Sequence, residues 1–176
     1  EMELVDRELA KLLQMIAAPD LAKRVILIVS ADHGEAFGEH GTQYHALTLY
    51  EELVRVPLYV VLPGAEPRSI EQPVTLMDLG PTILHLFGVA TPPEFMGESL
   101  LPLVQGKSAT LSRPIACDAG RRIQALYFPD GKKAIVDLKR STEELYDLRT
   151  DPGELENLID SDHAEPARHL NALRTF

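Results

Sequence analysis

Apolar residues recur every three or four positions over the first sixteen residues of the chain. This spacing predicts an amphipathic helix that ends or turns at Pro19 and Asp20. The apolar positions are Met2, Val5, Leu9, Leu12, Leu13 and Ile16. An unbroken, β-branched run at 25–29 then predicts a strand buried on both faces, as in a parallel sheet. The polar residues 32–35 follow at once, at the strand end where open α/β sheets carry their sites.

The middle of the chain continues this alternation of helix and strand. A short helix is predicted over 48–53 and a second buried strand over 57–62, where a Pro-Gly pair ends it. Residues 74–89 predict a helix that Gly88 closes. Residues 90–112 are rich in Pro, Gly and Ser, which indicates a surface connection.

From residue 113 onward the pattern changes to short strands. Pro129-Asp130-Gly131 predicts a hairpin turn between two of them, and the segment after Asp151 has moderate helix potential. The predicted strands are 115–117, 123–128, 133–138 and 144–148. We therefore expect an α/β part over 1–112 and a small subdomain over 113–176, built of an antiparallel sheet and a helix.

Composition and charge narrow the class of protein. A chain of 176 residues with 45% hydrophobic and 25% charged residues is an ordinary globular domain, and no apolar run approaches the length of a membrane span. The formal net charge of -10 argues against a nucleic acid partner, because binding a phosphate backbone requires a basic face. A small anionic substrate stays compatible, since a metal ion or a few local cations can dominate a pocket. A single cysteine excludes an intrachain disulfide.

Asp32 and His33 are the sharpest chemical feature. A carboxylate and an imidazole placed just past a buried strand offer oxygen and nitrogen ligands to one or two divalent cations. Gly34 permits a close approach of the backbone. The alternative is a solvated loop in which Asp32 caps the next helix and His33 has no role.

Three histidines, His33, His40 and His45, lie within thirteen positions, although the chain has only six. Their spacing matches neither a zincin helix nor a zinc finger, so we interpret them as a loop folding over a site. His45 is suited to bind an anion as imidazolium or to exchange a proton near neutral pH, and its alternative is a loop histidine bonded to backbone. His40 is expected to be structural.

Other polar residues receive simpler interpretations. Glu35 and Glu39 either bond the histidines or are acids of a first helical turn. We expect surface ion pairs for Glu51, Glu52 and Arg55, and solvated side chains for His169, Arg121 and Arg122. His85 is expected to lie in the core or at its boundary with its hydrogen bonds satisfied. Cys117 is expected to be a buried, inert thiol.

The segment 32–41, Asp-His-Gly-Glu-Ala-Phe-Gly-Glu-His-Gly, together with His45 and the segment 49–58, resembles the sulfatase family of the alkaline phosphatase superfamily. Further stretches agree in order along the chain. They are 5–9, 78–84, 144–148 and 151–158. The resemblance implies an α/β fold that forms part of an alkaline-phosphatase-like sheet with flanking helices.

The resemblance also implies roles for three residues. Those matching Asp32 and His33 ligate the catalytic divalent metal in the family, and the position of His45 matches a Lys or His that contacts oxygens of the transferred group. Calcium is the family's usual metal. Because calcium prefers all-oxygen ligands, the nitrogen of His33 leaves manganese or zinc open.

The family's nucleophile, a formylglycine made within a Cys/Ser-x-Pro-x-Arg motif, has no counterpart here, since Cys117 begins Cys-Asp-Ala-Gly. The resemblance therefore implies a C-terminal portion of a metal-dependent sulfatase that acts on a small anionic sulfate ester. On this interpretation, the chain alone is inactive and its partner is the missing N-terminal half of the same protein.

Several alternatives stay open. The first is a phosphodiesterase, a phosphonate monoester hydrolase or a phosphoethanolamine transferase of the same superfamily, with a phosphate ester as substrate. The second is a non-catalytic binding or assembly domain. The resemblance further implies a periplasmic or extracytoplasmic location, with a membrane anchor as one option in residues upstream. An apolar face left uncovered would favour self-association.

Overall fold

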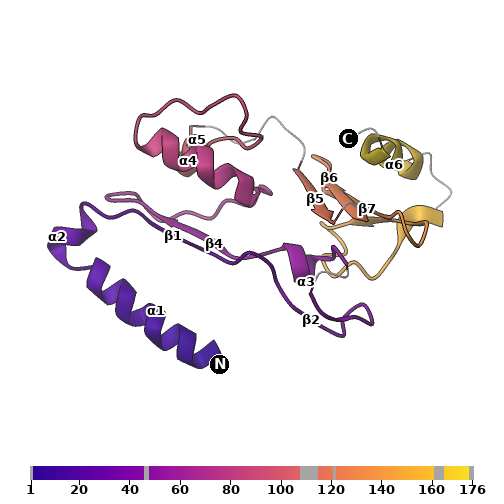
Figure 1. The fold of residues 1–176 in the computed structure, drawn as a ribbon, viewed down its shortest axis with the longest axis horizontal. Helices are drawn as coiled ribbons and strands as arrows, with labels where there is room; N and C mark the ends of the chain where they lie inside the picture. Colours follow the sequence, from indigo (N-terminus) through magenta and orange to yellow (C-terminus); the bar gives the residue numbers. More distant parts are fainter. Residues whose placement is uncertain (1, 46–47, 108–114, 121, 161–164, 175–176) are drawn as a thin grey trace. The chain divides into compact units, whose positions relative to one another are not determined.

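The computed structural model describes residues 2–45, 48–107, 115–120, 122–160 and 165–174 (Figure 1). The chain divides into two compact units. One runs to Ala31 and takes in Pro57–Ser69, and the other comprises Asp32–Val56 and the chain from Ile70 onward. The predicted boundary between 112 and 113 lies outside the described residues, so the division into 1–112 and 113–176 stays a prediction.

The first unit contains the predicted amphipathic helix, α1 (Met2–Ile16), and a short helix α2 (Pro19–Ala22) that begins at the expected proline. Several apolar side chains of α1, among them Val5 and Met15, are exposed. No helix among the described residues is both long and apolar enough to span a bilayer.

The strand predicted at 25–29 forms as β1 (Leu27–Ser30), but its expected parallel, fully buried setting is wrong. It pairs antiparallel with β4 (Leu58–Val61), and it is only half-buried. The Ser30 hydroxyl adds a hydrogen bond to the Pro57 carbonyl oxygen at 2.8 Å. A local apolar run does not specify the direction of a strand, and here the direction is set by a partner strand about thirty residues further along the chain.

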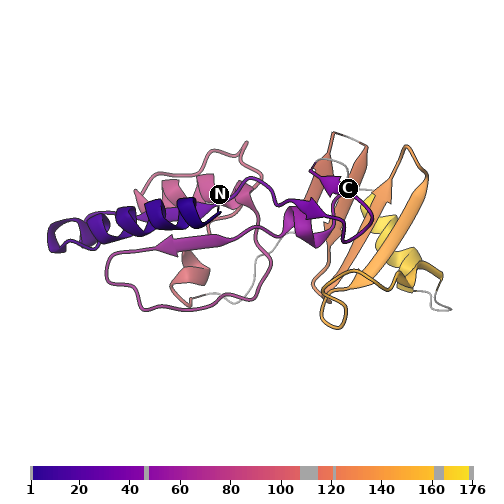
Figure 2. The ribbon, with the colours of Figure 1, turned by 90° about the horizontal axis from the view of Figure 1, so that it is seen from below.

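The second unit contains the predicted four-stranded antiparallel sheet, in the order β5-β6-β7-β8 (Figure 2). Its strands are β5 (Ile115–Ala119), β6 (Ile123–Tyr127), β7 (Lys132–Asp137) and β8 (Thr142–Asp147). Each strand pairs with the next in sequence, and the chain turns between β6 and β7 at the predicted Pro-Asp-Gly. The expected small sheet is therefore confirmed.

Both faces of this sheet are covered, and alternation along β7 separates them. One face packs against the helix α6 (Glu165–Arg174) through Ala134, Val136 and Leu170. The other face packs against the segment of α3 (Glu51–Val54) through Ile135, Tyr146 and Leu49. A short 3-10 helix η2 (Leu158–Asp160) adds Leu158 and Ile159 to the α6 side.

The helix predicted over 74–89 is shorter than expected and is built in two parts. A 3-10 turn η1 (Leu76–Asp78) leads into α4 (Leu79–Leu86), and Gly88 follows it with φ 69°. The buried Asp78 accepts hydrogen bonds from the backbone N–H groups of Thr75 at 2.9 Å and Glu98 at 2.8 Å. The stretch expected to be only a surface connection contains a further helix, α5 (Leu101–Val104), because Leu100, Leu101 and Leu103 are buried.

Candidate functional site

Asp32 and His33 lie together at the start of the second unit, where the sequence places them after β1. The Asp32 carboxylate accepts a hydrogen bond from the His33 backbone N–H at 3.0 Å, and its other oxygen lies 3.8 Å from His33 Nε2. The Asp32 side chain is 91% exposed, so its oxygens are accessible to a further partner.

The ring of His33 is held in one orientation by its own neighbour in sequence. Nδ1 lies 2.8 Å from the Gly34 carbonyl oxygen, and because a carbonyl only accepts, Nδ1 carries the proton of the neutral ring. Nε2, which faces Asp32, then presents a lone pair. The same hydrogen bond raises the pKa of His33 above its ordinary value.

A two-stranded hairpin brings His45 back to His33. The hairpin pairs β2 (Ala36–Phe37) with β3 (Gln43–Tyr44), so residues twelve positions apart meet beside each other. The rings of His33 and His45 stack with their centroids 4.5 Å apart. His45 Nδ1 lies 3.4 Å from a Glu35 carboxylate oxygen, to which it donates. The structure thus brings all three predicted site residues into one group.

The two candidate acids of this loop differ in what they bond. Glu35 accepts a hydrogen bond from His45, which matches the first of its two interpretations, a bond to one of the histidines. Glu39 instead accepts the backbone N–H of Phe37 at 2.6 Å, and backbone hydrogen bonds lower its pKa. Glu39 therefore stabilises the turn of the hairpin rather than a ring.

Gly34 joins this loop to α3. Its backbone N–H donates to the Leu53 carbonyl oxygen at 2.8 Å. A Cβ at position 34 would lie 2.0 Å from the Glu52 carbonyl oxygen, far inside any contact that a side chain makes. The glycine is therefore required by the close approach of two backbones, as the sequence suggested.

His40 is structural, as expected, and it joins three parts of the second unit. Nδ1 lies 2.8 Å from a Glu52 carboxylate oxygen, and Nε2 lies 3.1 Å from the Glu154 carbonyl oxygen. Its ring stacks on Tyr50 at a centroid distance of 3.7 Å. Both acceptors are oxygens, so both ring nitrogens donate and the ring is an imidazolium. Burial works against this charge, but the hydrogen bonds to Glu52 and to the Glu154 carbonyl, together with the charges of these two glutamates, outweigh it and raise the pKa of His40.

The surface ion pairs expected for Glu51 and Glu52 are wrong, because both carboxylates turn inward. Glu52 bonds His40, and Glu51 accepts from Lys133 Nζ at 2.9 Å and from the Tyr127 hydroxyl. Lys133 and Glu154, 2.8 Å apart, have fully buried side chains. No local pattern in the sequence indicates this cluster, since its members lie 76 to 103 positions from Glu51.

Other expectations have mixed outcomes. The prediction that His169 is solvated is wrong, because its side chain is buried against Phe128 and its Nε2 lies 2.9 Å from an Asp130 carboxylate oxygen. Arg122 pairs with Asp137 at 3.3 Å rather than being merely solvated, while Arg121 lies outside the described residues. Two other residues match. His85 is satisfied by the Ser99 hydroxyl, and burial raises the pKa of the Cys117 thiol, which makes it a poor nucleophile.

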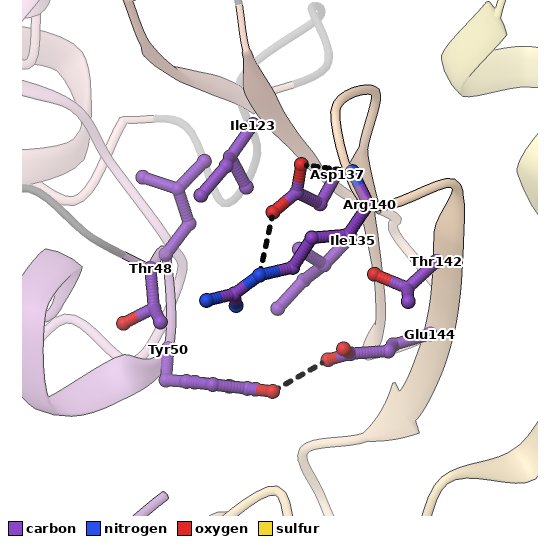
Figure 3. Close-up of a pocket in the computed structure, with 9 residues that line it drawn as sticks. Thr48, Tyr50, Ile123, Ile135, Asp137, Arg140, Thr142 and Glu144 are labelled. Atoms are coloured by element: carbon purple, nitrogen blue, oxygen red, sulfur yellow. Dashed lines mark hydrogen bonds and ion pairs between the residues drawn. The ribbon is translucent and has the colours of Figure 1, made fainter. Parts of the chain in front are cut away.

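A small pocket with a mixed polar and apolar lining lies between the 48–50 segment and strands β6 to β8 (Figure 3). Its lining includes Arg140, whose guanidinium faces Asp137, and Tyr50, whose hydroxyl donates to Glu144 at 2.8 Å. None of the predicted site residues Asp32, His33 and His45 lines it, although Tyr50 in its lining stacks on His40.

The residues present fit part of a metal site. Within the described ranges, no group of three or more His, Cys, Asp or Glu side chains is placed to hold an ion. Two donor atoms, however, are close enough to share one cation: His33 Nε2, with its lone pair, and an Asp32 carboxylate oxygen lie 3.8 Å apart. Ligand distances of about 2.0–2.6 Å allow a single cation to contact both. The described residues thus offer two donor atoms at a spacing that suits one cation, and they do not complete a metal site by themselves.

Comparison with known proteins identifies the family. The chain belongs to the sulfatase family, whose model, described as Sulfatase, matches residues 1–89. It is 32% identical over 167 residues to mouse (Mus musculus) arylsulfatase K, covering 87% of this chain and 30% of that protein. The chain thus spans about a third of the length of the curated relatives that it matches.

Solved structures share the fold. One is described in complex with its substrate, D-glucosamine-2-N,6-O-disulfate. It is 25% identical with a TM-score of 0.76, covering 97% of this chain and 37% of that one. Another, the phosphonate monoester hydrolase of Agrobacterium radiobacter, is 21% identical with a TM-score of 0.74, and the match covers 97% of this chain and 39% of that one. The α/β fold with its small antiparallel sheet and helices is therefore that of the sulfatase-like proteins, as the resemblance implied.

Proposed function

We propose that the whole protein is a metal-dependent hydrolase of sulfate esters, and that this chain supplies part of its metal and anion site. The observation that carries the proposal is the grouping of Asp32, His33 and His45, with the Gly34 carbonyl fixing the tautomer of His33. A backbone acceptor behind a ligating imidazole is a common support of metal sites. Family membership supports this reaction class.

Asp32 and His33 would hold a divalent cation. When bound, such a cation neutralises charge on the transferred group and lowers the pKa of a nucleophilic hydroxyl. Calcium is the family's usual metal but prefers all-oxygen ligands, so the nitrogen donor of His33 keeps manganese and zinc as candidates beside it.

His45 would contact oxygens of the transferred group. Its Nδ1 donates to Glu35, so Nε2 is the atom left to meet a substrate oxygen. In the role that the family resemblance gives it, His45 as an imidazolium would donate a charge-assisted hydrogen bond from Nε2 to an anionic ester. His45 would thereby offset locally the overall charge of -10, which repels anions.

The chemistry is incomplete within these residues. The chain holds no Cys/Ser-x-Pro-x-Arg motif, so the nucleophile and the remaining metal ligands would come from outside it. The 176 residues alone are accordingly expected to turn over no ester. An extracytoplasmic location is part of the same proposal and rests on the family resemblance.

The substrate class is tested by assaying the full-length protein on an aryl sulfate, an aryl phosphodiester and an aryl phosphonate. We expect turnover of the sulfate, lost in His45→Ala and kept in His85→Ala, which removes a histidine from α4. Turnover of the phosphorus esters alone would make the protein a phosphoryl hydrolase on the same fold. No turnover of any of the three esters would favour a binding or assembly role.

A further inference from the structure

A buried ionic cluster joins the C-terminal sheet to α3. Lys133, on β7, contacts two carboxylates: Glu51 at 2.9 Å and Glu154 at 2.8 Å. The side chains of Lys133 and Glu154 are fully buried, and that of Glu51 is 15% exposed. The Tyr127 hydroxyl also donates to Glu51, and the Lys133 ammonium lies over the Tyr127 ring.

Glu154 is the residue through which the cluster reaches the histidine loop. One carboxylate oxygen accepts the backbone N–H of Glu51 at 2.6 Å, at the first residue of α3. Its own carbonyl oxygen accepts from His40 Nε2 at 3.1 Å. Glu154 adopts φ 53°, a conformation unusual for a residue with a side chain. That backbone conformation lets one residue bond both α3 and the loop.

Two routes lead from this cluster to the candidate site. The first passes through α3, because the Leu53 carbonyl oxygen holds the backbone of Gly34, next to His33. The second passes through His40, which lies in the hairpin that returns His45 to His33. Both routes begin at Glu154 and end on residues of the proposed metal and anion site.

Apolar packing alone would not fix this geometry. Leu49, Ile135 and Tyr146 already bury the segment against the sheet, and apolar contacts tolerate small shifts and rotations. Buried ion pairs add little net stability over apolar contacts. The directional contacts here are the hydrogen bonds that Lys133 and Tyr127 donate to the Glu51 carboxylate and that the Glu51 N–H donates to Glu154. Breaking the pair is unfavourable, because it leaves a charge buried without its partner.

We infer that Glu154 and Lys133 are positioning residues that hold the loop of Asp32, His33 and His45 in its metal-binding arrangement. The inference rests on the proposed function for the nature of the site, but the coupling itself is a property of the fold. It assigns to the C-terminal sheet a part in the chemistry, although none of its residues reaches the candidate ligands.

The test compares the full-length wild-type protein with Glu154→Gln and Lys133→Met. Both variants keep the shape of the side chain and remove its charge. We expect amide hydrogen exchange in residues 32–45 to become faster by about tenfold or more, as a locally released loop would show. We also expect the affinity for Mn²⁺, titrated alone by calorimetry, to fall by about tenfold or more, the scale for lost support of a ligand.

Asp130→Asn is the matched control. It weakens a charge pair with His169, on the α6 side of the same sheet, and is expected to leave both readouts of the loop unchanged. If Glu154→Gln is well folded and neither readout changes, the inference is wrong. If Asp130→Asn changes both equally, the cluster serves general stability and the inference is also wrong.

Failure of the proposed function would be visible separately. A wild-type protein that hydrolyses no sulfate ester would overturn the proposed function, while the exchange comparison would still decide whether Glu154 controls the loop. Should Lys133→Met fail to fold, Glu154→Gln alone carries the comparison, since it keeps an oxygen acceptor for the Glu51 N–H.

Discussion

The backbone N–H of Gly34 donates to the carbonyl oxygen of Leu53 at 2.8 Å. This single bond joins the residue after His33 to α3, and no side chain stands between the two backbones. The arrangement explains why a glycine follows the Asp-His pair. It also means that the position of the candidate ligands depends on the position of α3.

Gly34→Ala should destabilise the protein and displace the loop. A Cβ would lie 2.0 Å from the Glu52 carbonyl oxygen and 3.3 Å from the Leu53 Cα, so one backbone has to move. Overpacking of this kind costs about 1–3 kcal/mol in the free energy of unfolding, measured by urea denaturation.

Gly153→Ala provides the comparison for that change. An added Cβ there meets its nearest atom, in Leu155, at 3.7 Å, which is an ordinary contact. We expect the free energy of unfolding of Gly153→Ala to stay within about 0.5 kcal/mol of the wild-type value. Equal stability of Gly34→Ala and Gly153→Ala would contradict the close packing of the loop on α3.

The bonds of His40 should make the loop's stability depend on pH. The His40 imidazole faces Glu52, the Glu154 carbonyl and Tyr50, and its pKa is raised above 6.5 in the folded protein. A raised pKa stabilises the fold fully below the unfolded value, and this contribution is lost as the pH rises through the folded value.

The measurement is the difference in free energy of unfolding between wild type and His40→Gln. At about pH 5.5 the difference should be about 1.5–3 kcal/mol, the scale of a charged hydrogen bond, and it should shrink by about pH 8.5. A difference that stays constant, or grows with pH, would show that His40 is not the imidazolium that its two acceptors require.

Asp78→Ala should destabilise the region before α4. Its carboxylate accepts the N–H groups of Thr75 and Glu98 from a fully buried position, and the substitution would leave both donors without it. The expected loss in free energy of unfolding is about 1.5–3 kcal/mol or more. Glu94→Ala, at an exposed position nearby, should change stability by less than about 0.5 kcal/mol.

The sequence predicted those elements whose pattern is local. The period of α1, the turn before β7 and the short strands of the C-terminal sheet are all visible in neighbouring residues. The grouping of Asp32, His33 and His45 was also foreseen. It came from their position after β1 and from the family resemblance, and the β2–β3 hairpin now gives its physical basis.

Features that depend on distant partners were missed or wrong. The direction of β1 is decided by β4, and the inward turn of Glu51 is decided by Lys133, 82 positions away. His169 carries no local sign that Asp130 and Phe128 will bury it. A charged residue on a short helix looks solvated until its partner is known, because charge alone predicts exposure.

The central claim is that Asp32 and His33 hold the metal of a sulfate ester hydrolase. The most direct measurement is aryl sulfate hydrolysis by the full-length protein after chelation and after addition of calcium, manganese or zinc, in wild type, His33→Ala and His85→Ala. We predict that chelation abolishes activity and that one of these metals restores it. His33→Ala should lower kcat/KM by about 100-fold or more, and His85→Ala should leave it unchanged. Full activity after chelation, or in His33→Ala, would contradict the claim.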